Sequence, residues 1–517
     1  MIVKSLFTFH KMSYIPPTKS IAPSIDAILA ITKQIQFNVS LDRSPNHYLH
    51  NCIFDVKKGD RQFDFHSSAT IRLGVDTYSN FQVEKDELVT LSNDSGLTLY
   101  TKGQSILINT LRTSEDHKFK IFSGGISSFS TEPDILNKTD LYLRFIIPVG
   151  VKQSFKIEDF QRYWFLETLD RKPTKTHFLK LDVQEEIHFY DYSYKESHYL
   201  IVDSFCKTSI ADFQKKCFCI LLTLGFVKGH LIHDECFILS YDTEELLVPK
   251  GLVYNSMRAS IQTHQPLFTT NYYSIYKDID YATDEKGMVA KDDPLYPRLN
   301  GDLLFFPDSV FSKIAVLCFT SEKFQRSILI FIDSHLSTLE TKIPNYYVAL
   351  EAIAAYVYQL REENNEEKIS VAPIKDPKIA EKLIQKISDL ATASKIESDL
   401  SDEDFSLEII LKNINRLNSP PNADKLKEAF TYIDYQLSNE QKRLLIDRNR
   451  YLHGSFLKIV GNDELFRKGF HAALKLETML AILIFKLGGY SGPVINYAGL
   501  WSNITELGQD EDRVLEI

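Results

Sequence analysis

Cysteine is scarce in this chain of 517 residues, which contains six cysteines and only two tryptophans. The cysteines are Cys52, Cys206, Cys217, Cys219, Cys236 and Cys318. Thiols so few and so widely spread do not form the pattern of a disulfide framework. They favour a protein that works in a reducing compartment.

Long hydrophobic runs are also missing. The longest apolar stretch, Cys217 to Val227 ("CFCILLTLGFV"), is well short of the roughly 18 to 20 residues that a membrane span needs. Lys4, His10 and Lys11 interrupt the N-terminal segment, which makes it a poor signal peptide. We therefore expect a cytoplasmic protein with no membrane association.

An excess of basic residues is absent as well, since the formal net charge is -10. This argues against a protein whose whole surface clamps a nucleic acid, because phosphate binding needs a concentrated basic surface. Locally the balance differs. Residues 438–475 hold eight Lys or Arg against four acids, whereas Glu397, Asp399, Asp402, Glu403, Asp404 and Glu408 form an acidic run.

Several common catalytic motifs are not found. The chain has neither a G-x-x-x-x-G-K-[ST] phosphate loop nor a G-x-G-x-x-G turn. The pairs Pro133-Asp134 and Pro307-Asp308 fit a metal-dependent nuclease only poorly, because the acid-x-Lys candidate at residues 366–368 falls in a polar linker. We expect no cofactor and no catalytic metal.

The hydrophobic pattern predicts an α+β protein in which a β-rich N-terminal region precedes an all-α bundle. Short segments rich in β-branched and aromatic residues fill residues 1–205 and indicate a sandwich or barrel-like domain. Residues 206–340 look mixed: a helix over 209–229 precedes strands at 236–242, 302–307 and 327–333. This segment is either a separate α+β part or continuous with the first domain. Helical periodicity then covers 344–490, followed by a tail over 491–517.

One short polar stretch in the helical half, Arg448 to Ser455 ("RNRYLHGS"), stands out. Ser438 and Gln441 have the spacing of a capping box and predict a helix start, and Gly454 predicts its end. Arg448 to His453 would then occupy the last turns of one continuous helix. Asn449 and His453, four residues apart, would share a face, and the long Arg448 side chain could reach the same place.

These side chains suit metal-free cleavage of RNA. An imidazole can take a proton from a ribose 2′-OH or give one to the leaving oxygen. A guanidinium can pair with the phosphate oxygens and stabilise the charge that develops on them. The alternative is structural, because basic residues near a helix C-terminus also favour the helix dipole and solvate the surface. By spacing alone, this alternative is the stronger one.

The surroundings of the motif resemble a known family. Arg448-Asn449, three further residues, and His453-Gly454 follow a bundle whose first helix reads "YYVALEAIAAYVYQL" and precede a long apolar helix. Over about residues 344 to 490, this arrangement resembles the HEPN superfamily and is most similar to the HEPN domains of ApeA-like anti-phage proteins.

The resemblance implies a metal-independent endoribonuclease that is active as a dimer and acts in anti-phage defence, abortive infection or toxin-type growth arrest. Arg448 and His453 match the catalytic pair, and Asn449 matches the polar position after the arginine. Glu351 and Arg450 are candidate supporting residues. Ser455 departs from the HEPN toxins controlled by tyrosine nucleotidylation, which carry a tyrosine there.

The expected substrate is RNA, either transfer RNA or messenger RNA, cut by 2′-OH attack to leave 2′,3′-cyclic phosphate ends. The N-terminal region would sense a phage or cellular trigger that the sequence does not identify. A second hypothesis is a non-catalytic RNA-binding or scaffold protein that dimerises through the bundle.

A second set of residues has ligand types that suit zinc. It comprises Cys206, Cys217, Cys219, His230, His233 and Cys236. The set lacks paired C-x2-C spacing, and two of its cysteines lie in the apolar run. Buried structural cysteines are the favoured interpretation.

Overall fold

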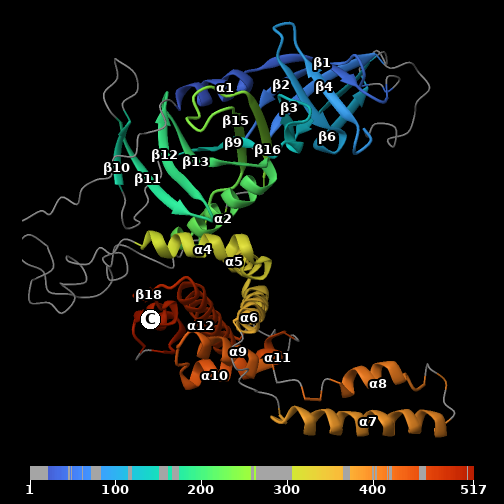
Figure 1. The fold of residues 1–517 in the computed structure, drawn as a ribbon, viewed down its shortest axis with the longest axis vertical. Coiled ribbons are helices and arrows are strands. Elements are labelled where there is room, and N and C mark those ends of the chain that lie inside the picture. The colour runs from blue at the N-terminus through green and yellow to red at the C-terminus, as the bar shows by residue number, and fades with distance from the viewer. Residues whose placement is uncertain are drawn as a thin grey trace, which may run out of the picture. The chain divides into compact units, whose positions relative to one another are not determined.

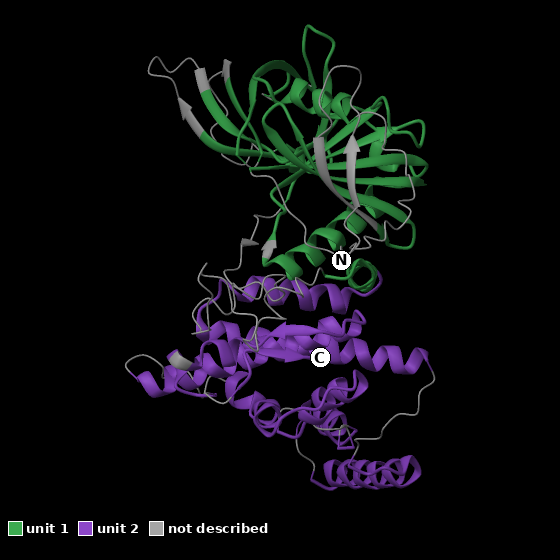
Figure 2. Cartoon of the chain, turned by 90° about the vertical axis from the view of Figure 1, so that its left-hand side faces the viewer, with its two compact units in different colours: residues 1–262, 281–319 green, residues 263–280, 320–517 purple. Residues whose placement is uncertain are grey.

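The structure is a computed structural model, and its description covers most of the chain. It describes residues 21–44, 47, 49–60, 62–70, 83–113, 119–150, 161–165, 174–257, 261–262, 306–364, 373–398, 401, 404–415, 417–418, 422–452, 462–508 and 511–517. The chain divides into two compact units (Figure 2): residues 1–262 with 281–319, and residues 263–280 with 320–517.

The first unit holds most of the strands (Figure 1). Its strands are β1 (Ile35–Leu41), β2 (Ile53–Lys58), β3 (Phe63–Thr70), β4 (Leu88–Ser92), β5 (Thr98–Lys102), β6 (Ile106–Thr113), β7 (Phe119–Ile126), β8 (Ser128–Ser130), β9 (Leu141–Val149), β10 (Gln161–Phe165), β11 (Thr174–Asp182), β12 (Glu186–Tyr194), β13 (Ser197–Thr208), β14 (His230–Leu231), β15 (Glu235–Tyr241), β16 (Gly251–Ser256) and β17 (Ile261–Gln262). Its helices are α1 (Ala22–Thr32), α2 (Ile210–Lys228) and α4 (Asp308–Thr320), with short 3-10 turns η2 (Gly103–Ser105) and η3 (Ile135–Asn137).

Fifteen of these strands form one antiparallel sheet, in the order β10-β11-β12-β13-β9-β15-β16-β8-β5-β4-β1-β2-β3-β7-β6. Only Ser127 separates β7 from β8, yet β7 pairs with β3 whereas β8 pairs with β5. The sheet therefore curls back on itself. Buried side chains alternate along β1, β2, β4 and β5, whereas β9, β12 and β15 are buried almost throughout. Apolar side chains fill the inside of the curl, where the Phe54 and Phe65 rings stack 4.3 Å apart.

The sheet continues beyond residue 205. β15 pairs with β9, and β16 pairs with both β15 and β8. Of the two arrangements left open by the sequence, the described part of residues 206–262 is thus continuous with the first domain. The helix expected over 209–229 is confirmed as α2, which ends at Gly229 in the left-handed conformation (φ 71°).

A buried charged network lies on β9. Arg144 donates from Nε and Nη2 to the two carboxylate oxygens of Asp203 on β13, at 2.7 and 2.9 Å, and both side chains are fully buried. Nη1 donates to Ser24 Oγ on α1 at 2.8 Å, and Tyr190 on β12 donates to Asp203 at 2.6 Å. Such a pair is tolerated in an apolar interior because its donors and acceptors are satisfied. It fixes the position of α1 on the sheet.

Replacing Arg144 by Ala should therefore lower the free energy of unfolding of the first unit by about 3 to 5 kcal/mol, because Asp203 would stay buried without its counterion. The double variant Arg144→Met/Asp203→Leu should lose less, since no charge then remains in the interior. Urea denaturation of the full chain measures both. Equal losses in the single and double variants would contradict this account.

The second unit is mainly helical. Its helices are α5 (Glu322–Ser334), α6 (Leu339–Glu363), α7 (Pro377–Ser398), α8 (Leu407–Ile414), α9 (Asn422–Tyr432), α10 (Asn439–Ile446), α11 (Arg448–Leu452), α12 (Asp463–Leu487), α13 (Tyr497–Leu500) and α14 (Ser502–Thr505). A small two-stranded antiparallel sheet of β18 (Pro493–Ile495) and β19 (Val514–Glu516) closes the C-terminal segment. The protein is thus an α+β protein, with a large antiparallel sheet in its N-terminal half and helices in its C-terminal half.

The strand expected at residues 327–333 ("SILIFID") is wrong, because these residues lie within helix α5. Ser321 caps this helix by accepting a hydrogen bond from the Phe324 amide. Its buried residues include Phe324, Ile328, Phe331 and Ile332, whose spacing of three and four is helical. β-Branched residues suggested a strand, but packing of this face against α6 decides the conformation. The second unit therefore begins before the boundary at residue 344 expected from the sequence.

No helix among the described residues is both long enough and apolar enough to cross a membrane.

Candidate functional site

The stretch that contains Arg448 does not continue the helix before it. The predicted capping box is present: Ser438 Oγ accepts from the Gln441 amide at 3.2 Å, and Gln441 Oε1 accepts from the Ser438 amide at 2.9 Å. The single continuous helix expected from residue 438 onward is wrong, because α10 ends at Ile446 and α11 starts at Arg448. Asp447 stands between them with ψ near 2°, and its carbonyl accepts from the Arg450 amide three residues on. The helical turn therefore tightens just where the motif begins.

Arg448 is held by a carboxylate from another helix. Its Nε forms an ion pair with Glu351 of α6, and the arginine side chain is 15% exposed. Nη1 also donates to Asn449 Oδ1 at 2.8 Å. The structure thus brings together Arg448, Asn449 and Glu351 of the predicted site residues. A guanidinium carries several N–H groups, so these two contacts leave donors that a phosphate oxygen can accept from.

Two tyrosines, Tyr347 on α6 and Tyr451 on α11, pack beside this position. Tyr347 is fully buried, and its hydroxyl donates to the Leu444 carbonyl of α10 at 2.6 Å. Its ring lies 5.9 Å from that of Tyr451 on α11. Burial raises the pKa of both phenols, so both stay neutral. Through Tyr347 and Glu351, helix α6 fixes both α10 and α11.

Of the other residues named from the sequence, the structure describes Arg450 but not His453. Arg450 lies on α11 with an exposed side chain. His453, with Gly454 and Ser455, lies outside the residues that the structure describes. The joint placement of the guanidinium and the imidazole therefore stays a prediction.

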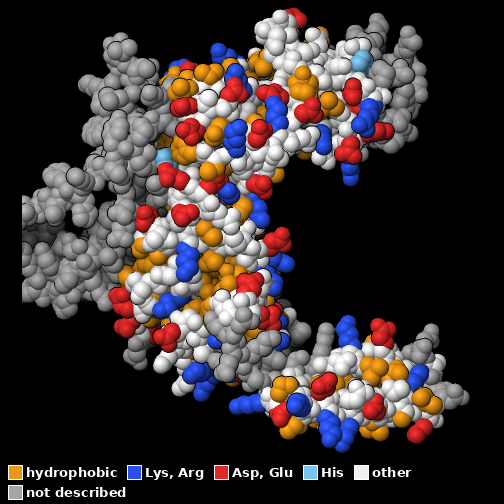
Figure 3. Space-filling model, in the orientation of Figure 1, with side chains coloured by type: hydrophobic (Ala, Val, Ile, Leu, Met, Phe, Trp, Pro, Cys, Tyr) orange, Lys and Arg blue, Asp and Glu red, His pale blue; other side chains and the backbone are white. Residues whose placement is uncertain are grey.

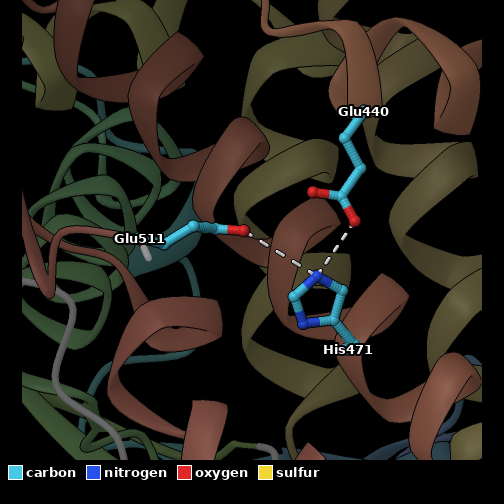
Figure 4. A group of neighbouring side chains, drawn as sticks. All are labelled: Glu440, His471 and Glu511. Atoms are coloured by element: carbon cyan, nitrogen blue, oxygen red, sulfur yellow. Dashed lines mark hydrogen bonds and ion pairs between the residues drawn. The ribbon is translucent and has the colours of Figure 1, made fainter. Parts of the chain in front are cut away.

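A second polar cluster lies at the start of α10, and Figure 4 shows three of its side chains pointing toward one another. His471 Nε2 of α12 lies 3.1 Å from Glu440 Oε1 and 3.9 Å from Glu511 Oε1. Lys475 of α12 lies 3.1 Å from Glu440 Oε2 and also pairs with Glu511. The hydrogen bond with His471, together with Lys475, lowers the pKa of Glu440 to about 2. The cluster ties α10, α12 and the C-terminal segment into one framework.

Glu440, His471 and Glu511 also form the one His, Cys, Asp or Glu group in the described part of the chain that is compact enough to hold a metal ion. The Lys475 ammonium already lies against both carboxylates and balances much of their charge. A metal ion would have to displace it from a buried position. The arrangement suits a structural ion-pair cluster.

Three of the four cysteines of the suggested zinc set lie in the apolar core. Cys217 and Cys219 are fully buried in α2, Cys236 is buried in β15, and Cys206 is exposed. Burial raises the pKa of Cys217 and Cys236, which opposes the thiolate form that zinc requires. The His233 ring packs 4.8 Å from that of Phe218, and the side chain of His230 lies outside the described residues.

Three groups were missed at the sequence level: the Arg144 network, the Glu440 cluster and the Tyr347 hydrogen bond. A signal existed for the first two. Arg144 interrupts the apolar strand "LYLRFIIPV", and His471 and Lys475 interrupt the apolar helix "FHAALKLETMLAIL". Isolated charges in apolar runs are seldom left unpaired. For Tyr347 the sequence carries no such signal.

Glu440→Gln should make the protein less stable at neutral pH by about 1 kcal/mol, because half of the side chain is exposed and solvent screens its ion pairs. A carboxyl group whose pKa is lowered on folding stabilises the fold above its unfolded pKa. This contribution is lost as the pH falls from about 4.5 towards about 2. The difference between wild type and variant should shrink over that range, as measured by urea denaturation at several pH values. The exposed Glu408→Gln serves as control, and a difference independent of pH would refute the assignment.

Comparison with known proteins identifies no relative of this chain: no family model, no curated protein and no solved structure matches it. The resemblance to the HEPN superfamily therefore depends on the motif and on its place among the helices.

Proposed function

We propose that this protein is a metal-independent endoribonuclease of the HEPN type, acting in anti-phage defence or toxin-type growth arrest. The observation that carries the proposal is the environment of Arg448 on α11. Its guanidinium forms an ion pair with Glu351 and donates a hydrogen bond to Asn449, and further N–H donors remain for a phosphate. The segment is locally basic within an acidic chain. That local charge suits an RNA backbone.

In this proposal His453 acts as the general acid or base on the ribose 2′-OH or the leaving 5′ oxygen. Arg448 stabilises the charge that develops on the non-bridging oxygens. Asn449 and Glu351 orient the guanidinium, and Arg450 adds positive charge beside it. A homodimer would supply two such motifs, so that one histidine could take a proton while the other gives one. The β-rich unit would receive the trigger.

The same contacts also favour a second function. An arginine that pairs with a glutamate of the neighbouring helix stabilises the bundle whether or not RNA is present. The alternative is therefore a non-catalytic RNA-binding or scaffold protein in which Arg448 holds α11 on α6. Activity and stability measurements on the same variants separate the two.

Purified protein should cut total RNA in the presence of EDTA and leave 2′,3′-cyclic phosphate and 5′-OH ends. Arg448→Ala should slow cleavage by about 100- to 1,000-fold, because charge on the phosphate loses its stabilising donor. His453→Ala should slow it by about 100-fold or more. The rates are measured on end-labelled RNA, and the ends are identified by enzymatic phosphorylation.

Arg443→Ala is the matched control for these variants, because Arg443 is an exposed arginine on the preceding helix α10. It should cut RNA at the wild-type rate. Cleavage that persists in both Arg448→Ala and His453→Ala, or that EDTA abolishes, would rule out the mechanism. RNA binding without cleavage in the wild type would favour the alternative.

Glu351→Gln tests the positioning of Arg448 separately. The amide keeps the shape of the side chain but loses the charge that orients the guanidinium. We expect kcat to fall by about 10- to 100-fold, with KM unchanged or lower and with little change in the unfolding midpoint. The scaffold hypothesis predicts instead a loss of stability and no RNA cleavage in any variant. A kcat equal to that of the wild type would remove Glu351 from the proposed site.

A further inference from the structure

The hairpin of helices α7 and α8 carries an apolar stripe that the described chain does not cover. Of the 22 residues of α7, only Ala380 is buried. Ile379, Leu383 and Leu390 are 59%, 44% and 67% exposed. At about 100° per residue these three side chains lie within about 40° of one another on the helix surface. Figure 3 shows apolar side chains exposed among charged ones over this hairpin.

Helix α8 covers a different side of α7. The less exposed residues of α7, among them Ala380, Ile384 and Ala391, lie on a face about 100° from the stripe, and α8 packs against α7. The stripe is therefore adjacent to the contact with α8 and separate from it. Scattered single apolar residues on a surface are ordinary, but three aligned over three turns indicate an interface.

The charges along α7 point to what covers the stripe. Its first half carries Lys378, Lys382 and Lys386 against one acid, Glu381. Its second half carries Asp389 and Glu397, and the acidic run that includes Asp399 and Asp404 follows directly. The one lysine of this half, Lys395, donates to the Ser401 carbonyl at 2.8 Å and so serves the turn to α8. The helix is thus basic at one end and acidic at the other.

A helix with this charge pattern is complementary to an antiparallel copy of itself. In an antiparallel pair, a twofold axis passes near the middle of α7 and relates the two chains. Leu383 of each chain then lies opposite Leu390 of the other chain, so this contact occurs twice. Lys382 then lies within a turn of Asp389 of the second copy, on the same flank of the stripe. Parallel pairing would set lysines against lysines and acids against acids.

We propose that the α7–α8 hairpin is a self-association surface through which two copies of this chain pair antiparallel, with Ile379, Leu383 and Leu390 at its centre. The proposal does not rest on ribonuclease activity, since it involves none of the residues of the candidate site. It assigns an isologous contact, in which each chain offers the same patch.

The experiment measures the mass of the full-length protein by analytical ultracentrifugation. Wild type should be dimeric, and Leu383→Glu/Leu390→Glu should be monomeric or raise the dimer dissociation constant by about 10-fold or more, because each chain would bury two charges at the contact. Leu336→Glu is the matched control, since Leu336 is 64% exposed and lies outside the α7–α8 hairpin. It should stay dimeric. Circular dichroism and the unfolding midpoint verify that each variant is folded.

Charge reversal distinguishes pairing between chains from docking onto the same chain. Lys378→Glu/Lys382→Glu and Asp389→Lys/Glu397→Lys should each be monomeric alone and should form a heterodimer when mixed. A monomeric wild type, a dimer that survives Leu383→Glu/Leu390→Glu, or reversed variants that fail to pair on mixing would each overturn the proposal. Loss of RNA cleavage in Arg448→Ala without loss of the dimer would leave it standing, so the two proposals fail separately.

Discussion

Helix α6 is the element on which the arrangement of the second unit depends. Four polar side chains of α6 each contact a different neighbouring helix. Three are tyrosine hydrogen bonds and one is an ion pair: Tyr346 with Glu477 of α12, Tyr347 with the Leu444 carbonyl of α10, Tyr358 with Glu428 of α9, and Glu351 with Arg448 of α11. A tyrosine ring fills apolar volume, but its buried hydroxyl must reach an acceptor. Each of these contacts therefore fixes the rotation of α6 more narrowly than apolar packing alone, and with it the places of α10 and α11.

The contact between Arg448 and Glu351 has consequences for both proposed functions. A carboxylate beside a phosphate-binding arginine weakens the local positive potential, which costs affinity for RNA. It also prevents the long side chain from sampling other rotamers, which favours a fixed geometry at the reacting phosphate. A phosphodiester carries one charge, as a carboxylate does, and it can approach the guanidinium along another edge. The contact therefore suits catalysis in which the orientation of the Arg448 guanidinium matters more than the affinity for RNA. It equally suits a purely structural role, in which Arg448 only holds α11 on α6.

Local signals explain which parts of the fold could be predicted from sequence. Ser438 with Gln441, Pro377 at the first position of α7, and Gly229 after α2 act within one turn of chain, and all three mark helix ends correctly. Contacts distant in sequence explain the failures. Residues 327–333 form a helix because their buried face packs on α6. The helix breaks at Asp447, next to Arg448, and Arg448 pairs with Glu351, which lies 97 residues earlier in the chain. Arg144 and Asp203 pair across two strands, so the sequence marks each as unusual without indicating its partner.

Helix α7 differs from its neighbours in what stabilises it. Most helical stability in proteins comes from packing of an apolar face, and only Ala380 of the 22 residues of α7 is buried. A bond such as that from Gln385 to Asp389, four residues apart, adds only a few tenths of a kcal/mol. Contact with α8 covers one side, and α8 is itself only eight residues long. The folding of the hairpin should therefore be coupled to whatever covers the stripe of Ile379, Leu383 and Leu390. If a second copy covers it, helicity in this segment rises with protein concentration.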